Sequence, residues 1–172
     1  MEVLERFAQG DLEAFETLFR QFQGEAYSWI VRIVRDRGIA EDLTVETFWR
    51  IYRAHARFHP EGNFRAWARR IATNAALDHL KTARREVALP DDLAAAAQPD
   101  PAVHREVHEQ IERAFRELPA RLQVVATLAL VEEESYEQVA EALGISVGAV
   151  KSRVFRAVRL LRRKLKGLGL EP

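Results

Sequence analysis

Apolar residues recur every three or four positions along almost the whole chain, which is the spacing of α-helices that bury one face. Strand-like alternation of apolar and polar residues is nearly absent. The first apolar stripe follows Asp11, a residue type that caps helix N-termini, and consists of Phe15, Leu18, Phe19, Phe22, Ala26, Trp29, Ile30 and Ile33. The pattern predicts a second helix over about residues 40–58 and a third from an Asn63 cap to about residue 83.

Residues 84–101 interrupt this helical pattern. They include Pro90, Pro99 and Pro101, the acidic pair Asp91 and Asp92, and a short alanine tract. Prolines in a stretch without apolar periodicity are typical of linkers. We therefore predict a helical domain at residues 1–85, a flexible linker at 86–105 and a second helical domain at 106–172.

The second half of the chain predicts four helices. An amphipathic helix over about residues 103–118 stops at Pro119, and another covers about residues 121–131. Ser135 and Gln138 form a capping box that opens a short helix, and Gly144 is placed to end it in the left-handed conformation. Ser146 can cap a last helix to about residue 165. Short helix, glycine turn and long helix are the helix-turn-helix arrangement, so the predicted fold is all-α with a helix-turn-helix in the second domain.

The last predicted helix has two distinct faces. Its apolar face consists of Val147, Val150, Val154, Ala157, Val158, Leu161 and Leu165. The opposite face carries Ser152, Arg156, Arg159 and Arg163, with Lys151 and Phe155 at the flank. Polar and basic side chains near the start of such a helix contact base edges and phosphates in the DNA major groove. The second domain is therefore predicted to bind duplex DNA.

The net charge of zero, from 26 basic and 26 acidic residues, conceals separate charged blocks. Residues 146–170 hold eight Lys or Arg and no acid, and residues 65–85 hold six bases and Asp78 alone. Residues 86–119 are acidic, with eight acids and three bases. Two basic blocks favour a polyanionic partner, and the remaining surface is free for protein contacts.

The N-terminal half presents two further candidate surfaces. On the second helix, a charged face consists of Asp42, Val45, Glu46, Trp49, Arg50, Arg53 and Arg57. Trp and Arg are enriched at binding hot spots, so this face is a candidate protein-docking surface; the alternative is that Trp49 packs on a neighbouring helix. The third helix interleaves aromatic side chains with Lys and Arg, a combination that suits single-stranded nucleic acid. The residues concerned, with one asparagine among them, are Phe64, Arg65, Trp67, Arg69, Arg70, Asn74, Lys81, Arg84 and Arg85.

Five segments of the chain match the motifs of one protein family in order and spacing. They are residues 10–15 (GDLEAF), 40–54 (AEDLTVETFWRIYRA), 64–78 (FRAWARRIATNAALD), the pair Leu118 and Pro119, and 135–157 (SYEQVAEALGISVGAVKSRVFRA). Together they resemble the bacterial RNA polymerase sigma factors of the compact extracytoplasmic-function (group IV) type. Two positions depart from the family pattern: Val45 stands where glutamine is usual, and Trp49 where an aliphatic residue is common.

The resemblance implies two helical domains that bind core RNA polymerase and promoter DNA. It implies that the clamp coiled coil of the largest polymerase subunit is bound by Asp42, Glu46, Trp49, Arg50 and Arg53. It implies that the minus-ten element is melted, and its flipped base held, by Phe58, Trp67, Arg70, Asn74, Lys81, Arg84 and Arg85. It implies that the minus-thirty-five element is contacted by Lys151, Ser152, Phe155, Arg156 and Arg159. The acidic linker would enter the polymerase cleft, and an anti-sigma protein is an expected partner.

Two other functions fit part of the sequence. A stand-alone helix-turn-helix regulator explains the second domain but leaves the Trp49 face and the third helix without a role. A zinc hydrolase is suggested by His104 and His108 at helical spacing, but the zincin motif requires glutamate where Arg105 stands. The absence of cysteine excludes thiolate zinc sites and cysteine nucleophiles, and no phosphate-binding glycine loop is present.

We therefore expect a protein that is not an enzyme and has no metal, cofactor or small-molecule substrate. The N-terminal residues do not have the pattern of a signal peptide. The longest apolar stretch, residues 124–131, is too short to cross a bilayer. A cytoplasmic protein without membrane insertion is expected.

Overall fold

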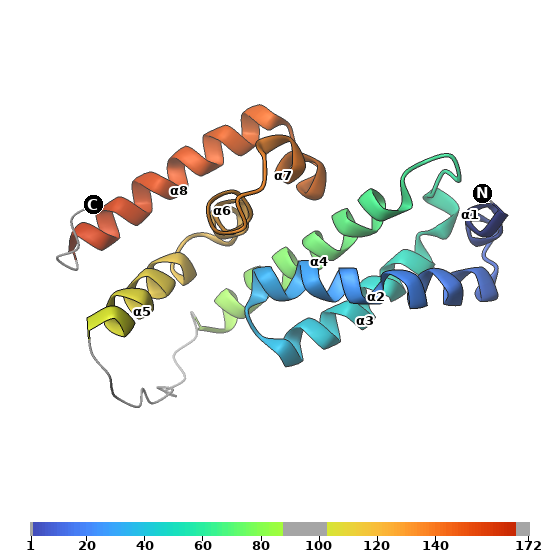
Figure 1. The fold of residues 1–172 in the computed structure, drawn as a ribbon, viewed down its shortest axis with the longest axis horizontal. Helices are drawn as coiled ribbons and strands as arrows, with labels where there is room; N and C mark the ends of the chain where they lie inside the picture. Colours follow the sequence, from blue (N-terminus) through green and yellow to red (C-terminus); the bar gives the residue numbers. More distant parts are fainter. Residues whose placement is uncertain (1, 88–102, 168–172) are drawn as a thin grey trace. The chain divides into compact units, whose positions relative to one another are not determined.

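The computed structural model describes residues 2–87 and 103–167, and every regular element in those ranges is helical (Figure 1). The predicted all-α fold class is confirmed. The chain divides into two compact units, one formed largely by residues up to Leu80 and the other largely by residues after it, and each is described by itself. The predicted linker, with Asp91 and Asp92, lies mostly outside the described residues.

The N-terminal unit begins with α1 (Glu2–Ala8) and α2 (Leu12–Val34). As predicted, Asp11 caps α2: its carboxylate accepts a hydrogen bond from the backbone N–H of Ala14 at 2.9 Å. The predicted apolar stripe faces the core of this unit, where Leu18, Ile30 and Ile33 are buried.

The second helix differs from its predicted bounds at both ends. α3 spans Arg37–Arg53, because Asp36 accepts a hydrogen bond from the backbone N–H of Ile39 and starts the helix early. Its C-terminal cap is Ala54, whose backbone N–H donates to carbonyl oxygens of the last turn, those of Arg50, Ile51 and Tyr52. The short 3₁₀ helix η1 (His55–Arg57) follows. The prediction that this helix continues to Phe58 was wrong, since Phe58 has extended backbone angles.

The long helix α4 (Phe64–Val87) completes the N-terminal unit with its residues up to Leu80. Its predicted cap is confirmed, because the side-chain oxygen of Asn63 accepts a hydrogen bond from the backbone N–H of Ala66 at 3.0 Å. α4 extends past the predicted end at residue 83. Its buried face consists largely of small side chains, Ala68, Ala72, Thr73, Ala75 and Ala76, which allow the neighbouring helices to approach closely.

The second half of the chain forms α5 (Val103–Arg116), α6 (Ala120–Ala126), the π-helical turn η2 (Thr127–Val131), α7 (Tyr136–Leu143) and α8 (Val147–Gly167). All of these elements except the end of α7 belong to the C-terminal unit. α5, α6 and α8 share a core of Ala114, Leu118, Ala126, Ala157 and Leu161, against which Phe115, Leu122, Leu160 and Leu165 pack. The helix predicted over residues 121–131 therefore consists of an α-helical part and a π-helical end.

The predicted caps of the helix-turn-helix are confirmed. The side chain of Gln138 accepts a hydrogen bond from the backbone N–H of Ser135, and the Ser135 hydroxyl accepts one from the N–H of Gln138. Gly144 has a φ of +65°, which a residue without Cβ adopts readily. Ser146 accepts a hydrogen bond from the N–H of Ala149 at 3.1 Å and starts α8.

Candidate nucleic-acid and partner interfaces

A cluster of aromatic rings lies where α1, η1 and α4 meet. Phe7 is completely buried and its ring centre lies 5.9 Å from that of Phe58, 5.6 Å from Phe64 and 6.3 Å from Trp67. Phe58 and Trp67, both predicted to hold a melted base, are themselves 5.1 Å apart. Phe58 is only 5% exposed, whereas Trp67 is half-buried at the edge of the cluster. Of this pair, Trp67 is the ring that solvent reaches.

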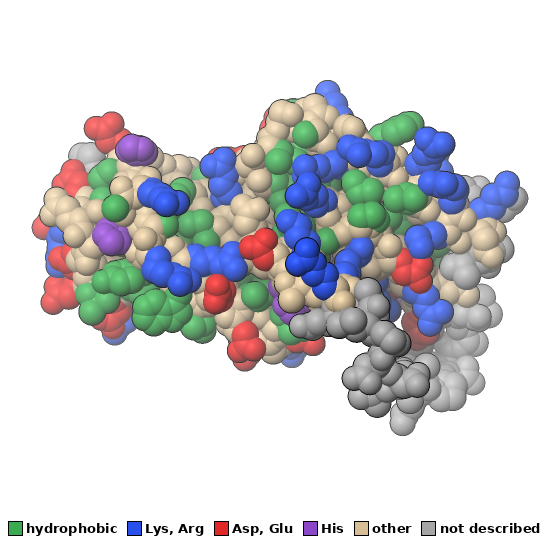
Figure 2. Space-filling view, turned by 180° about the vertical axis from the view of Figure 1, so that it is seen from behind, with side chains coloured by type: hydrophobic (Ala, Val, Ile, Leu, Met, Phe, Trp, Pro, Cys, Tyr) green, Lys and Arg blue, Asp and Glu red, His purple; other side chains and the backbone are tan. Residues whose placement is uncertain are grey.

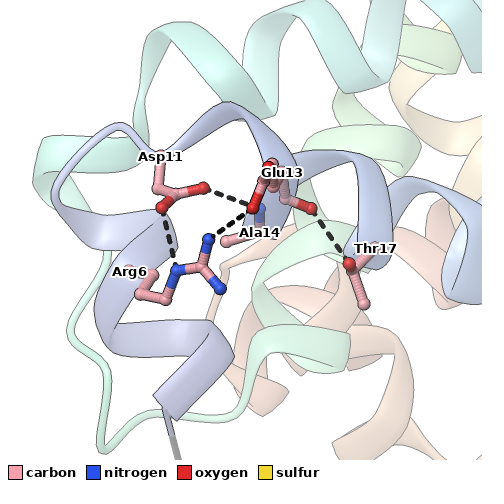
Figure 3. Close-up of polar contacts among 5 residues, drawn as sticks. All are labelled: Arg6, Asp11, Glu13, Ala14 and Thr17. Carbon is pink, nitrogen blue, oxygen red and sulfur yellow. Dashed lines mark hydrogen bonds and ion pairs between the residues drawn. The ribbon is translucent and has the colours of Figure 1, made fainter.

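The turn between α1 and α2 fixes Phe7 in this cluster. Gly10 has a φ of +86°, and a Cβ at this position would lie 3.0 Å from Nε2 of His55. Arg6 donates to the carboxylates of Asp11 at 2.8 Å and Glu13 at 2.9 Å (Figure 3). The backbone N–H of Ala14 and the Arg6 guanidinium together hold the pKa of Asp11 below its usual value. Sequence reasoning missed Phe7, although its place three residues before Gly10 of the GDLEAF motif was a usable signal.

The polar residues predicted to contact single-stranded DNA lie along α4. At helical spacing, Trp67, Arg70, Asn74, Lys81 and Arg85 share one face of this helix. Arg70 and Arg85 are exposed, and the side-chain amide of Asn74 donates to the backbone carbonyl of Arg70 at 2.8 Å. Arg84 lies to one side of this face and is half-buried, which lowers the pKa of its guanidinium.

The predicted docking face on α3 is open to solvent at its centre. Trp49 is 57% exposed and Val45, one turn earlier, is 54% exposed. The alternative that Trp49 packs on a neighbouring helix is therefore wrong. Asp42 and Arg53 are also exposed. Arg50 differs, because it is half-buried and bonded to two carboxylates of its own unit, Glu46 and Asp78.

The predicted duplex-binding face of α8 is exposed over three turns. Phe155 is 69% exposed, and Lys151, Ser152, Arg156 and Arg159 are exposed around it. Figure 2 shows Lys and Arg side chains gathered on one face of the molecule, with hydrophobic side chains between them. A shallow groove of about 520 Å³ runs beside this surface and is lined by Tyr136, Lys151, Val154, Phe155, Val158, Arg159, Arg162 and Arg163.

Arg153, next to Ser152 on α8, is half-buried. Its burial, together with the nearby charges of Arg121 and Arg156, lowers its pKa. In the described ranges, no group of three or more His, Asp or Glu side chains could hold a metal ion. His108 is exposed and lies 3.6 Å from Glu112.

Comparison with known proteins decides the family. Residues 18–86 match sigma-70 region 2, and residues 108–161 match sigma-70 region 4. The chain belongs to the sigma-70 family of RNA polymerase sigma factors. The region 2 match contains α3 and α4 with their two candidate faces, and the region 4 match contains the helix-turn-helix.

Individual relatives place this sigma factor in the extracytoplasmic-function group. It is 32% identical to the RNA polymerase sigma-H factor of Pseudomonas aeruginosa, over 97% of this chain and 94% of that protein. It is 31% identical to the ECF RNA polymerase sigma-E factor of Haemophilus influenzae, over 96% and 95%. The solved structure of CnrH in complex with the cytosolic domain of CnrY is 25% identical, with a TM-score of 0.57 over 96% of each chain.

Membership in this family settles the alternatives left by the sequence. A sigma factor is a transcription initiation factor that works with core RNA polymerase at promoters, and not an enzyme. The stand-alone regulator was the wrong alternative, because such a protein has no sigma-70 region 2. In the part of the chain that the structure describes, no helix is both long and apolar enough to cross a membrane.

Proposed function

We propose that the three exposed faces divide the work of this sigma factor: α3 binds core polymerase, α4 melts the minus-ten element and α8 reads the minus-thirty-five element. The observation that carries the proposal is the exposure of Trp49. Exposing a large apolar ring to water is unfavourable in free energy, and a binding partner that covers the ring removes this cost. The two basic faces, on α4 and α8, suit DNA phosphates.

The docking face on α3 has the composition of a binding hot spot. Trp49 and Val45 lie one helical turn apart and form its apolar centre. Asp42, Glu46 and Arg53 surround them with charges of both signs. An apolar centre within a charged rim is the usual anatomy of a protein–protein interface. Since Val45 and Trp49 are the two positions that depart from the family pattern, this sigma factor binds its polymerase through more apolar contact than is usual.

The basic face of α4 suits a melted strand. Trp67 offers a ring at the edge of the aromatic cluster, and the cations at 70, 81 and 85 follow on the same face. Stacking of one base on an aromatic ring is worth about 1–3 kcal/mol, which is comparable to the cost of unstacking it from the duplex. The buried rings of Phe58 and Phe64 pack against Trp67 and hold it in place.

The face of α8 suits the major groove of duplex DNA. Its leading residues, Gly148 and Ala149, are small and allow the helix to approach base edges closely. Lys151, Ser152 and Arg156 follow within two turns and are all exposed. The Arg156 guanidinium already lies beside the Ser152 hydroxyl at 3.3 Å, so the two can contact neighbouring positions of one site.

Trp49→Ala tests the polymerase-binding face. Loss of a hot-spot ring costs about 2 kcal/mol or more, so we expect the affinity for core polymerase to fall about 30-fold. Leu12→Ala is the matched control, because Leu12 is a 65% exposed apolar residue at the start of α2. Affinity is measured with labelled sigma factor and purified core enzyme. Equal affinities of Trp49→Ala and wild type would contradict the assignment.

Regulation and cellular setting follow from the same proposal. The CnrH structure contains the cytosolic domain of a second protein, CnrY. By this likeness we infer that a second protein binds this chain too, and that it is an anti-sigma protein that covers the surfaces needed for polymerase. Because core polymerase and promoters are in the cytoplasm, we infer that this sigma factor acts there.

A further inference from the structure

Asp78 is the single acidic residue within residues 65–85 of the basic helix α4. At helical spacing it lies on the same face as Trp67 and Asn74, in the surface assigned to DNA. A carboxylate beside phosphates is repulsive. Its presence there therefore calls for a partner of opposite charge.

That partner is Arg50 on α3. Nη1 of Arg50 lies 2.9 Å from Oδ2 of Asp78, and Nε of the same guanidinium lies 2.9 Å from Oε1 of Glu46. One guanidinium thus joins a carboxylate of its own helix to a carboxylate 28 positions along the chain. The two carboxylates raise the pKa of Arg50, and the side chain of Arg50 is only 34% exposed.

The position of the pair connects two of the proposed working surfaces. Arg50 follows Trp49 directly on α3, whereas Asp78 lies on α4. A side chain held on two sides by carboxylates has fewer N–H groups free for an outside partner than a side chain that extends into solvent. Arg50 can therefore support the docking face without touching polymerase itself.

We propose that Asp78 is a positioning residue. Through its ion pair with Arg50 it holds α3 to α4, and so fixes the position of the docking face around Trp49 relative to the DNA-melting helix. The proposal rests on the proposed docking function of α3. It reassigns Arg50 from a polymerase contact to an internal support. Since Asp78 and Arg50 are partly exposed, the effect of the pair is moderate, about two- to fivefold in affinity.

The test is a double-mutant cycle in the full chain, read as affinity for core polymerase. Arg50→Ala and Asp78→Asn should each weaken binding about two- to fivefold, and the double variant should bind no more weakly than Arg50→Ala. Asp78→Glu, which keeps the charge, should restore most of the affinity. Glu25→Gln is the matched control, since it removes the 2.6 Å ion pair with Arg65 between α2 and α4 without touching α3.

Each other outcome overturns the proposal. If Arg50→Ala weakens binding and Asp78→Asn does not, Arg50 contacts polymerase directly. If Asp78→Asn lowers the affinity for core polymerase as much in the Arg50→Ala variant as in wild type, Asp78 acts through another group. If Glu25→Gln weakens binding equally, the effect reports general loosening of the helices. Thermal unfolding of every variant shows that it is folded, and Trp49→Ala in the same assay shows separately whether α3 docks at all.

Discussion

At the scale of single residues, three large rings that the sequence pattern placed in helices serve different purposes. Trp29 is 7% exposed and Phe58 5% exposed, whereas Trp49 is 57% exposed. The sequence pattern predicted that Trp49 is exceptional, because its helical neighbours are charged. It did not predict that Phe7 buries Phe58, because this contact joins α1 to a residue far away in the sequence. A periodic pattern in the sequence does not predict contacts between segments that are distant in the chain.

The predicted DNA contacts on α8 differ from the predicted polymerase contacts on α3 in having few competing partners. Lys151 and Phe155 extend from the helix, and Arg156 bonds only weakly to its neighbour Ser152, at 3.3 Å. Arg50, by contrast, is already bonded to two carboxylates. The sequence predicted both arginines as contacts in the same way, since charge and helical face do not reveal an ion pair to another helix.

Arg156→Ala should weaken binding of the minus-thirty-five duplex by about 1–3 kcal/mol, because an arginine can form two hydrogen bonds to one guanine. Binding to a scrambled duplex should change much less. The measurement is titration of labelled duplexes at one fixed salt concentration, since the phosphate contribution varies with salt. Arg163→Ala, on the same face but farther from the start of the helix, is the control for a phosphate contact, whose loss weakens binding to both duplexes equally. An equal loss on matched and scrambled duplexes would make Arg156 a phosphate contact.

Asp11 predicts a specific dependence of stability on pH. Its pKa in the folded chain is lowered by the N–H of Ala14 and by Arg6, so the ionised form stabilises the fold. That stability is complete above the unfolded value of about 4 and is lost as the pH falls through the lower folded value. Asp11→Asn keeps the helix cap but loses the ion pair with Arg6.

We therefore expect Asp11→Asn to be less stable than wild type at pH 7, with the difference shrinking below about pH 4. Urea unfolding at a series of pH values measures it. Comparing variant with wild type removes the contributions of other carboxylates such as Glu117, whose pKa is lowered by Lys164. A difference that stays constant from pH 7 to pH 3 would contradict the role of the Arg6 pair.

At the scale of helices, the caps were the most predictable features. Asp11, Asn63, Ser135 and Ser146 each accept the expected hydrogen bond, because a cap is a local interaction within four residues. The ends of α3 were less predictable. Asp36 starts the helix one turn before the apolar pattern becomes regular, and its C-terminal end is set by a 3₁₀ turn that has no strong sequence signal.

Ser146 and Ser152 give a matched pair of variants on the recognition helix. Ser146→Ala removes the cap of α8 and should lower the free energy of unfolding by about 1 kcal/mol. Ser152→Ala, on the exposed face, should leave stability within about 0.5 kcal/mol of wild type and weaken minus-thirty-five binding instead. Chemical unfolding and duplex titration separate the two effects. Equal loss of stability in both variants would contradict the role of Ser146 as the cap that stabilises α8.

At the scale of the whole molecule, the segregation of charge is what the sequence predicted best. The basic blocks at residues 65–85 and 146–170 fall on two different helices, α4 and, over the described residues, α8. Each block alone offers modest, salt-dependent attraction to DNA. Two weak sites on one chain become selective when a large partner fixes both against the same promoter. The account therefore requires core polymerase for tight and specific binding.

Run-off transcription from genomic DNA fragments with purified core RNA polymerase tests this requirement most directly. The account predicts discrete transcripts from defined start sites when the chain is added, few or none with core enzyme alone, and fewer with Trp49→Ala. Identical transcripts with and without the chain, together with tight binding of the free protein to duplex DNA, would contradict it.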